Sequence, residues 1–138
     1  MAAFNKFNQF VEDLGLGVHN LSTGALRVYL SNAVPSVSLD LVKTDLAEIA
    51  AGNGYVAQGE LVGGSWTETA GTGTKTGVDI VWTATGAIGP FQYAVLFNDT
   101  PTAPVDPVIG WWDYGTPISL AIGETFTVDF GASVFTIA

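Results

Sequence analysis

Short runs in which apolar and polar residues alternate recur along most of the chain, and they constrain its fold more than any other feature. In residues 78–85, the apolar side chains of Ile80 and Trp82 alternate with Asp79 and Thr83. Because successive side chains of a strand point to opposite faces, this pattern predicts a β-strand with one buried face. Similar apolar runs predict further strands at residues 26–31, 65–70, 91–97, 109–114, 118–120, 125–130 and 134–137.

Turn signals separate these strands at short intervals. The sequence AGNGY at residues 51–55 contains Asn-Gly, which tolerates the positive φ of a tight turn. Residues 98–107 contain three prolines and predict a long loop, and the glycine-rich stretch 71–77 predicts a hairpin loop. Residues 45–50 fit either a short helix or a strand. Many short strands with frequent turns indicate a mainly β fold, an antiparallel β-sandwich of the jelly-roll kind, in which the apolar run 91–97 is central and buried.

The N-terminal segment has a different spacing. Phe4, Phe7, Val11 and Leu14 recur every three or four residues, which predicts one α-helix over about residues 4–14. Gly15 and Gly17 follow and end the helix. Two interpretations remain open: the helix covers one end of the sheet core, or it is an arm that docks on a neighbouring molecule.

The length of the chain fits one domain, which we place at residues 1–138. The absence of cysteine excludes disulfides and thiolate metal sites. The first residues lack the unbroken apolar run of a signal peptide, and no stretch is apolar enough for a membrane span. We therefore expect a soluble protein that folds in the cytoplasm where it is made, without a membrane partner.

Charge is scarce and one-sided. Four basic residues stand against 13 acidic ones, for a net charge of −9, so we expect no direct binding to nucleic acid. Charged residues make up 12% of the chain, about half of the usual share, whereas apolar residues make up 48%. We expect some apolar surface to be covered by a partner or by other copies of the chain. The alternative is a monomer coated with threonine and glycine.

Signals for chemistry are weak. The stretch 71–77 resembles a phosphate-binding loop only superficially, because Thr74 rather than glycine precedes Lys75 and a strand follows. His19 is the only histidine, and we interpret it as a solvated or capping residue. Asp113 beside two tryptophans lacks an identifiable acid partner for glycoside hydrolysis, and Asp99 and Asp106 lack the spacing of a calcium loop. We expect no enzyme activity, no cofactor and no metal.

The pair Trp111-Trp112 is the most informative local feature. Neighbouring side chains of a strand point to opposite faces, so one of the two rings must lie outside the sandwich core. It is covered by the N-terminal helix with its phenylalanines, or it serves as an interface anchor, or it stacks on a sugar. The candidate interface residues are Phe4, Phe7, Trp111, Trp112 and Tyr114.

Several blocks of the chain carry a family resemblance. The opening FNKFNQFVEDL, the block DLAEIAAGNGY at 45–55, GPFQYAVLFND at 89–99, and IGWWDYG followed by GETFTVDF within 109–130 together resemble small structural proteins of tailed bacteriophages. The resemblance extends in order over nearly the whole chain and is least over residues 58–77. Proteins of this kind are virion, head-decoration or fibre-like components.

The resemblance implies a capsid decoration or cement protein of the virion, assembled in the host cytoplasm. Its partners would be other copies of itself, as a homo-oligomer and often a trimer, and the major capsid protein. Its mechanism would be to cover contacts of the shell through apolar patches, so that opening the shell also exposes the buried interface. The alternatives are a tail, collar or fibre component, and a carbohydrate-binding module that contacts host surface glycans through Trp111 or Trp112.

Overall fold

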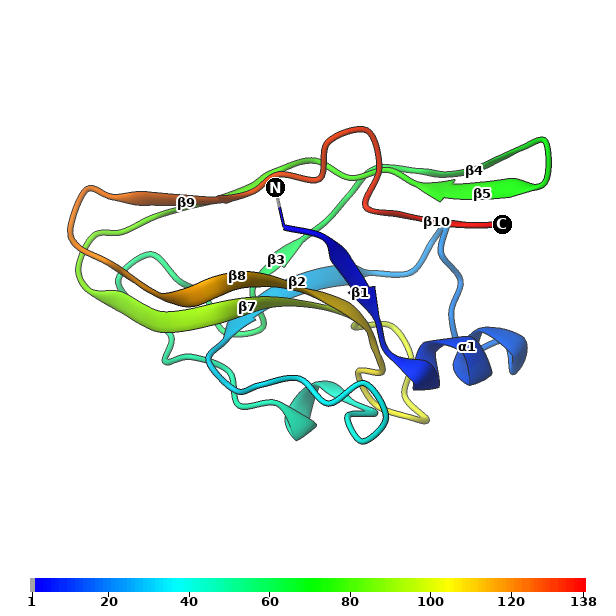
Figure 1. Ribbon diagram of the computed structural model, residues 1–138, viewed down its shortest axis with the longest axis horizontal. Helices are drawn as coiled ribbons and strands as arrows, with labels where there is room; N and C mark the ends of the chain where they lie inside the picture. Colours follow the sequence, from blue (N-terminus) through cyan, green and yellow to red (C-terminus); the bar gives the residue numbers. More distant parts are fainter. Residues whose placement is uncertain (1) are drawn as a thin grey trace.

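A five-stranded antiparallel sheet and two smaller sheets form two layers in the computed structural model, which describes residues 2–138 (Figure 1). The large sheet has the strand order β1-β8-β7-β2-β3, and the smaller sheets have the orders β10-β5-β4 and β6-β9. The elements are β1 (Phe4–Lys6), α1 (Asn8–Gly15), β2 (Leu26–Ser31), the 3-10 helix η1 (Lys43–Asp45), β3 (Glu60–Leu61), β4 (Trp66–Thr69), β5 (Thr72–Lys75), β6 (Ile80–Thr83), β7 (Ile88–Asn98), β8 (Val108–Leu120), β9 (Thr125–Val128) and β10 (Phe135–Ile137). The predicted mainly β, antiparallel sandwich with one helix near the N-terminus is confirmed.

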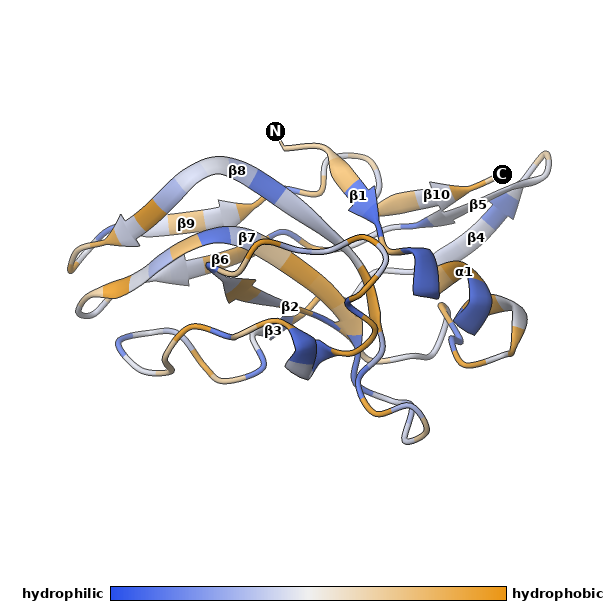
Figure 2. Cartoon of the chain, turned by 60° about the horizontal axis from the view of Figure 1, so that its bottom comes forward, coloured by the Kyte–Doolittle hydropathy of each residue, from blue (hydrophilic) through white to orange (hydrophobic). Residues whose placement is uncertain are grey.

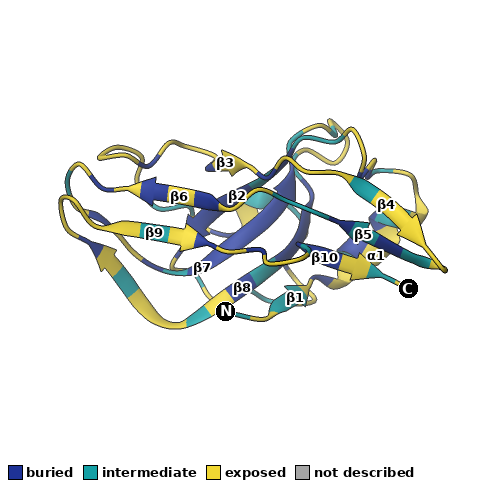
Figure 3. Cartoon of the chain, turned by 90° about the horizontal axis from the view of Figure 1, so that it is seen from above, coloured by how far each residue is buried: buried dark blue, intermediate teal, exposed yellow. Residues whose placement is uncertain are grey.

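The central part of the large sheet is buried on both of its faces. Leu30, Leu96 and Trp112 point into the core between the two layers, whereas Tyr29 and Phe97 belong to a second apolar cluster on the opposite face. This second cluster lies between the sheet and the loops around η1, which run along that face of the sheet in Figure 1. Figure 3 shows β7 as an almost continuously buried strand, and the prediction of a central, buried strand at 91–97 is confirmed.

The N-terminal segment differs from the predicted helix over 4–14. Residues Phe4–Lys6 form β1, which pairs antiparallel with β8 in the register Phe4↔Trp112, and α1 begins only at Asn8. The helix buries Phe10 and Asp13, whereas Val11, predicted to lie on the buried stripe, is 55% exposed. The edge of β8 offers unpaired backbone groups, and pairing with it satisfies residues 4–6 better than another turn of helix.

Two other predicted boundaries were wrong. Residues 109–114 and 118–120 are not separate strands, since β8 runs through all of them and bends at Gly115, where φ is +86°. The predicted hairpin loop at 71–77 is mostly strand β5, and the turn between β4 and β5 lies at Ala70 and Gly71, both with positive φ. Residues 45–50 contain the end of η1 and otherwise irregular backbone, apart from an isolated antiparallel bridge between Glu48 and Ser31.

Candidate functional site

Five aliphatic side chains are exposed on two neighbouring loops at the side of the large sheet that carries η1. Val34, Val37, Leu39, Leu41 and Val105 are 78%, 46%, 76%, 43% and 61% exposed, and we call them the apolar loop surface. Figure 2 shows hydrophobic stretches along these loops beside η1. Apolar side chains gathered in this way, rather than scattered singly, are typical of surfaces that bind other proteins.

Backbone hydrogen bonds join the two loops. The N–H of Lys43 donates to the carbonyl of Asp106 at 2.8 Å, and the N–H of Val108 donates to the carbonyl of Leu41 at 3.2 Å. Val42 and Pro107 form an antiparallel bridge between them. The loop containing residues 34–41 is therefore fixed against the loop that carries Val105.

Two carboxylates hold the first loop in shape. Asp40 Oδ2 accepts a hydrogen bond from the N–H of Ser36 at 2.6 Å, and Asp40 is itself 9% exposed. Asp45 Oδ2 accepts from the N–H groups of Leu41 and Val42 at 2.8 and 3.0 Å. Such local side-chain bonds to the backbone fix a turn without regular secondary structure, so the aliphatic side chains are presented on an ordered loop.

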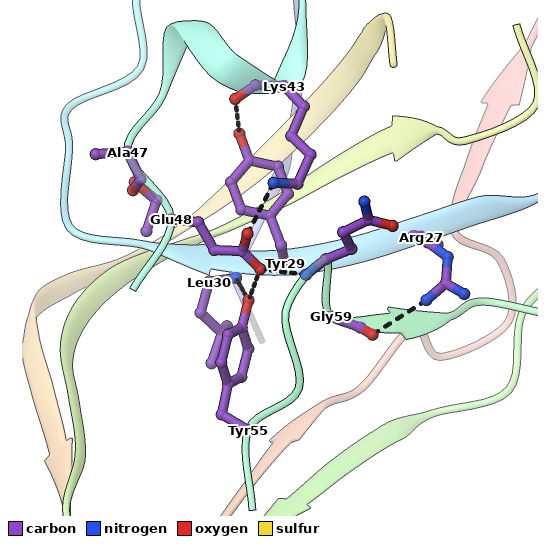
Figure 4. Close-up of polar contacts among 10 residues, drawn as sticks. Arg27, Tyr29, Leu30, Lys43, Ala47, Glu48, Tyr55 and Gly59 are labelled. Carbon is purple, nitrogen blue, oxygen red and sulfur yellow. Dashed lines mark hydrogen bonds and ion pairs between the residues drawn. The ribbon is translucent and has the colours of Figure 1, made fainter. Parts of the chain in front are cut away.

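A buried polar network anchors the same segment to the sheet (Figure 4). Lys43 Nζ lies 2.7 Å from Glu48 Oε2, and the hydroxyl of Tyr55 donates to Glu48 Oε1 at 2.8 Å. The N–H of Leu30 in β2 donates to the Tyr55 hydroxyl at 3.0 Å, and the hydroxyl of Tyr29 donates to the carbonyl of Lys43 at 3.0 Å. Every polar group in this chain of contacts has a partner, which is the condition for a stabilising buried network.

The electrostatics of this network keep its phenols protonated. Burial, with a smaller effect of Glu48, raises the pKa of Tyr29 far above its usual range, and burial is also the largest cause of the raised pKa of Tyr55. Lys43 Nζ lies 4.8 Å from the centre of the Tyr29 ring, a cation–π distance. Groups held in this way donate hydrogen bonds and carry no reactive phenolate, so we assign the network a structural role.

The five residues predicted as an interface are divided between the interior and the surface. Phe7 is 0% and Trp112 4% exposed, so both pack inside the molecule. Phe4, Trp111 and Tyr114 are half-buried. Burial raises the pKa of Tyr114 to about 12. Only these three retain surface that another molecule could contact.

The two tryptophans point to opposite faces of β8, as predicted. Trp112 packs in the core against Phe4 and Phe130, with ring centroids 5.4 and 5.6 Å apart. Trp111 packs in the second cluster against Phe7, at a centroid distance of 4.5 Å. Phe7, which directly precedes α1, covers part of the Trp111 ring, and Trp111 stays half-buried.

His19 is buried, which corrects the interpretation of a solvated or capping residue. It is 7% exposed, and burial lowers its pKa. The side-chain oxygen Oδ1 of Asn98 accepts from the N–H of Thr100 at 3.1 Å. The side-chain nitrogen Nδ2 of Asn98 therefore donates to His19 Nδ1, also at 3.1 Å. Within residues 2–138, His19 Nε2 and Asp13 Oδ2 have no hydrogen-bond partner. The ring also borders a pocket of about 450 Å³ that Leu14, Leu21 and Trp66 help to line.

The remaining polar candidates do not assemble into a reactive group. Asp113 accepts hydrogen bonds from Gln92 at 2.9 Å and from the N–H of Gly115 at 2.8 Å, and these bonds lower its pKa. Burial and the neighbouring Asp99 raise the pKa of Asp106. Among the residues described, no three His, Cys, Asp or Glu side chains are close enough together to hold a metal ion. The helices within residues 2–138 are too short or too polar to span a membrane.

Searches with this chain against protein-family models, curated proteins and solved structures gave no match. The site must therefore be interpreted from its own geometry. Sequence reasoning missed the apolar loop surface, although its signal was present: aliphatic residues recur at positions 34, 37, 39 and 41, beside Pro35 and several serines.

Proposed function

We propose that the protein is a non-enzymatic structural component of a virion, a capsid decoration or cement protein that binds other protein through its apolar loop surface. The observation that carries the proposal is the exposure of Val34, Val37, Leu39, Leu41 and Val105 on two adjoining loops that hydrogen bonds hold in one shape. The resemblance of the sequence to small structural proteins of tailed phages supports the virion as the setting.

The physical mechanism is cementing. Burial of the exposed part of one aliphatic side chain of this surface contributes about 1 kcal/mol to an interface. A single contact of this size is weak after the cost of association, but many copies on one shell add their contributions. Opening the shell must then also expose these side chains to water, so a decorated shell melts at a higher temperature.

The composition of the surface fits this role. The chain carries 13 acidic and four basic residues, which keeps it away from packaged nucleic acid by charge repulsion. Two of the basic side chains, Arg27 and Lys43, are already paired with Asp99 and Glu48. The interactions left to the protein are apolar contact and backbone pairing, either with copies of itself as a homo-oligomer or with a major capsid protein.

The test is binding of the purified protein to preformed phage shells that lack it. We expect a fixed copy number per shell and a higher melting temperature of the shell. The variant Leu39→Ser removes a side chain that is 76% exposed, and we expect its affinity to fall about five-fold. The control Leu16→Ser changes an equally exposed leucine outside the apolar loop surface and should bind as the wild type does.

Two outcomes would contradict a decoration role. Binding of a few copies at one vertex or at the tail, located by immunogold labelling, would instead indicate a tail, collar or fibre component. Equal binding by Leu39→Ser and the wild type would remove the apolar loop surface from the mechanism. A role in binding glycans would depend on the half-buried Trp111, since Trp112 is buried, and Phe7 already covers part of the Trp111 ring.

A further inference from the structure

Lys75, in β5, has a largely buried side chain, and its ammonium group has no counter-charge within residues 2–138. Its residue is 3% exposed, and within residues 2–138 it makes no ion pair and its ammonium group donates no side-chain hydrogen bond. The other three basic residues are in ordinary settings: Arg27 and Lys43 are paired with carboxylates, and Lys6 is exposed. Burial alone lowers the pKa of Lys75, and no charged neighbour contributes. Nζ is not fully buried, so this lysine covers its apolar stem and brings its ammonium group to the surface.

Lys75 lines a small pocket. The pocket has a volume of about 210 Å³ and lies where β2 begins and where the chain leaves β3. Its walls are mostly glycine and other small residues, among them Ser22, Gly24, Gly63 and Gly64. Pockets for drug-sized ligands usually measure about 300–1,000 Å³, so this one suits a group of a few atoms.

The backbone of the pocket wall offers hydrogen-bond donors. Gly63 and Gly64 are consecutive residues with φ of +65° and +73°, and neither N–H donates to another backbone or side-chain group in residues 2–138. A side chain at Gly64 would meet the carbonyl oxygen of Thr76 at 2.1 Å, so this backbone shape requires glycine there. Successive backbone N–H groups in turn conformations form concave sites that attract anions. The hydroxyl of Ser22 is a further donor on the same wall.

We propose that this pocket binds a small oxyanion, a phosphate or carboxylate group, with Lys75 Nζ as its counter-charge and the N–H groups of Gly63 and Gly64 as hydrogen-bond donors. An oxyanion matches both features, since its oxygens accept from an ammonium group and from backbone N–H groups at the same time. The net charge of −9 repels anions from the protein as a whole, so a local cation is needed to hold one. The site is independent of the apolar loop surface and of the proposed virion role.

The test is a titration of the isotopically labelled protein, followed by amide NMR, with inorganic phosphate and separately with acetate at constant ionic strength. We expect saturable shifts of the Gly63 and Gly64 resonances, with chloride as the control salt. Stronger shifts with phosphate would assign the site to phosphate, and stronger shifts with acetate would assign it to carboxylates. Absence of saturable shifts with both anions would overturn the proposal.

Two variants separate this site from general charge effects. Lys75→Met keeps the length of the side chain and removes the charge, and we expect it to lose the shifts. Lys6→Met removes an exposed lysine with the same change in net charge and should keep them. At saturating phosphate, we expect the melting temperature of the wild type to rise by about 3 °C or more and that of Lys75→Met to stay constant. Equal responses of the two proteins would contradict a site at Lys75, and if Lys75→Met does not fold, the wild-type titration still decides.

Discussion

Removal of the Glu48 carboxylate should be among the most damaging single changes to the stability of this protein. Glu48 accepts from Lys43 Nζ at 2.7 Å, from the Tyr55 hydroxyl at 2.8 Å and from the N–H of Gln58 (Figure 4). The side chains of Lys43 and Glu48 are 11% and 17% exposed. Loss of one partner from a buried ion pair costs about 3–5 kcal/mol, because the other charge stays buried without compensation. For Glu48→Ala, we expect about 3 kcal/mol, at the low end because water can reach the exposed part of the pair.

Three further variants divide this free energy into its parts. Glu48→Gln keeps an acceptor for Tyr55 and removes the charge, so we expect a loss of about 2 kcal/mol. The double variant Lys43→Met with Glu48→Leu leaves no unpaired charge and should lose less than Glu48→Ala alone. Glu60→Ala removes an exposed glutamate of β3 and should change the stability by about 0.5 kcal/mol or less.

The assay is unfolding in urea at pH 7, with the slope m compared between the variants. A lower midpoint at unchanged m measures a loss of stability and excludes a change in the unfolded state. If Glu48→Ala loses less than about 1 kcal/mol, as an exposed glutamate would, then the ion pair is not desolvated as its burial implies, and the reasoning is refuted.

Two other predictions concern the N-terminal strand and the buried histidine. Gly110→Ala should destabilise the protein by about 1–3 kcal/mol in urea unfolding, because the new Cβ would meet the Phe4 ring at 2.3 Å. The control Gly15→Ala has open space around its Cβ and should leave the stability unchanged. Equal urea midpoints for the two variants would contradict the packing of β1. Because burial lowers the pKa of His19, the unfolded chain takes up a proton near pH 6.5 before the folded protein does. Stability should therefore fall as the pH drops below about 6.5, and the fall should be smaller in His19→Gln; the same pH dependence in both would show that His19 is not the cause.

Local periodicity predicted the strands well where burial follows a simple rule. The run 91–97 is apolar at every position except Gln92, and a strand covered on two faces is the structure that buries such a run. The strand at 26–31 and the opposite orientations of Trp111 and Trp112 follow from the same alternation. These features depend on neighbouring residues only, and the sequence is sufficient for them.

The N-terminal segment shows where such reasoning ends. The spacing of Phe4, Phe7 and Val11 fits a helical face, but Phe4 instead packs against Phe135 at 5.3 Å and pairs with β8, more than 100 residues away along the chain. The glycine at 110 leaves the space that the Phe4 ring fills. This long-range fit outweighs the local helical preference, and spacing along the chain cannot reveal it.

The candidate sites were harder to predict for a related reason. Val37, Leu39 and Leu41 alternate as in a half-buried strand, yet all three are exposed, since Asp40 and Asp45 fix the loop through its backbone. Lys75 was predicted in a hairpin loop, and only the fold places it beside Gly63 and Gly64. The exposure of a loop and the neighbours of a lysine side chain depend on which segments pack together, and that information is not local.

The net charge of −9 provides a way to distinguish the two kinds of partner proposed for the apolar loop surface. Copies of the chain repel one another, so added salt, which screens this repulsion, should strengthen self-association measured by sedimentation. A basic surface on a capsid shell attracts the chain, and the same salt should weaken that binding. The apolar contact itself changes little over this range, because its contribution depends on buried area rather than on charge. If self-association weakens as salt is raised from 50 to 300 mM (a Debye length of roughly 14 falling to 6 Å), charge pairs hold the copies together. Contacts of Val34, Leu39 and Val105 would then not be the cause.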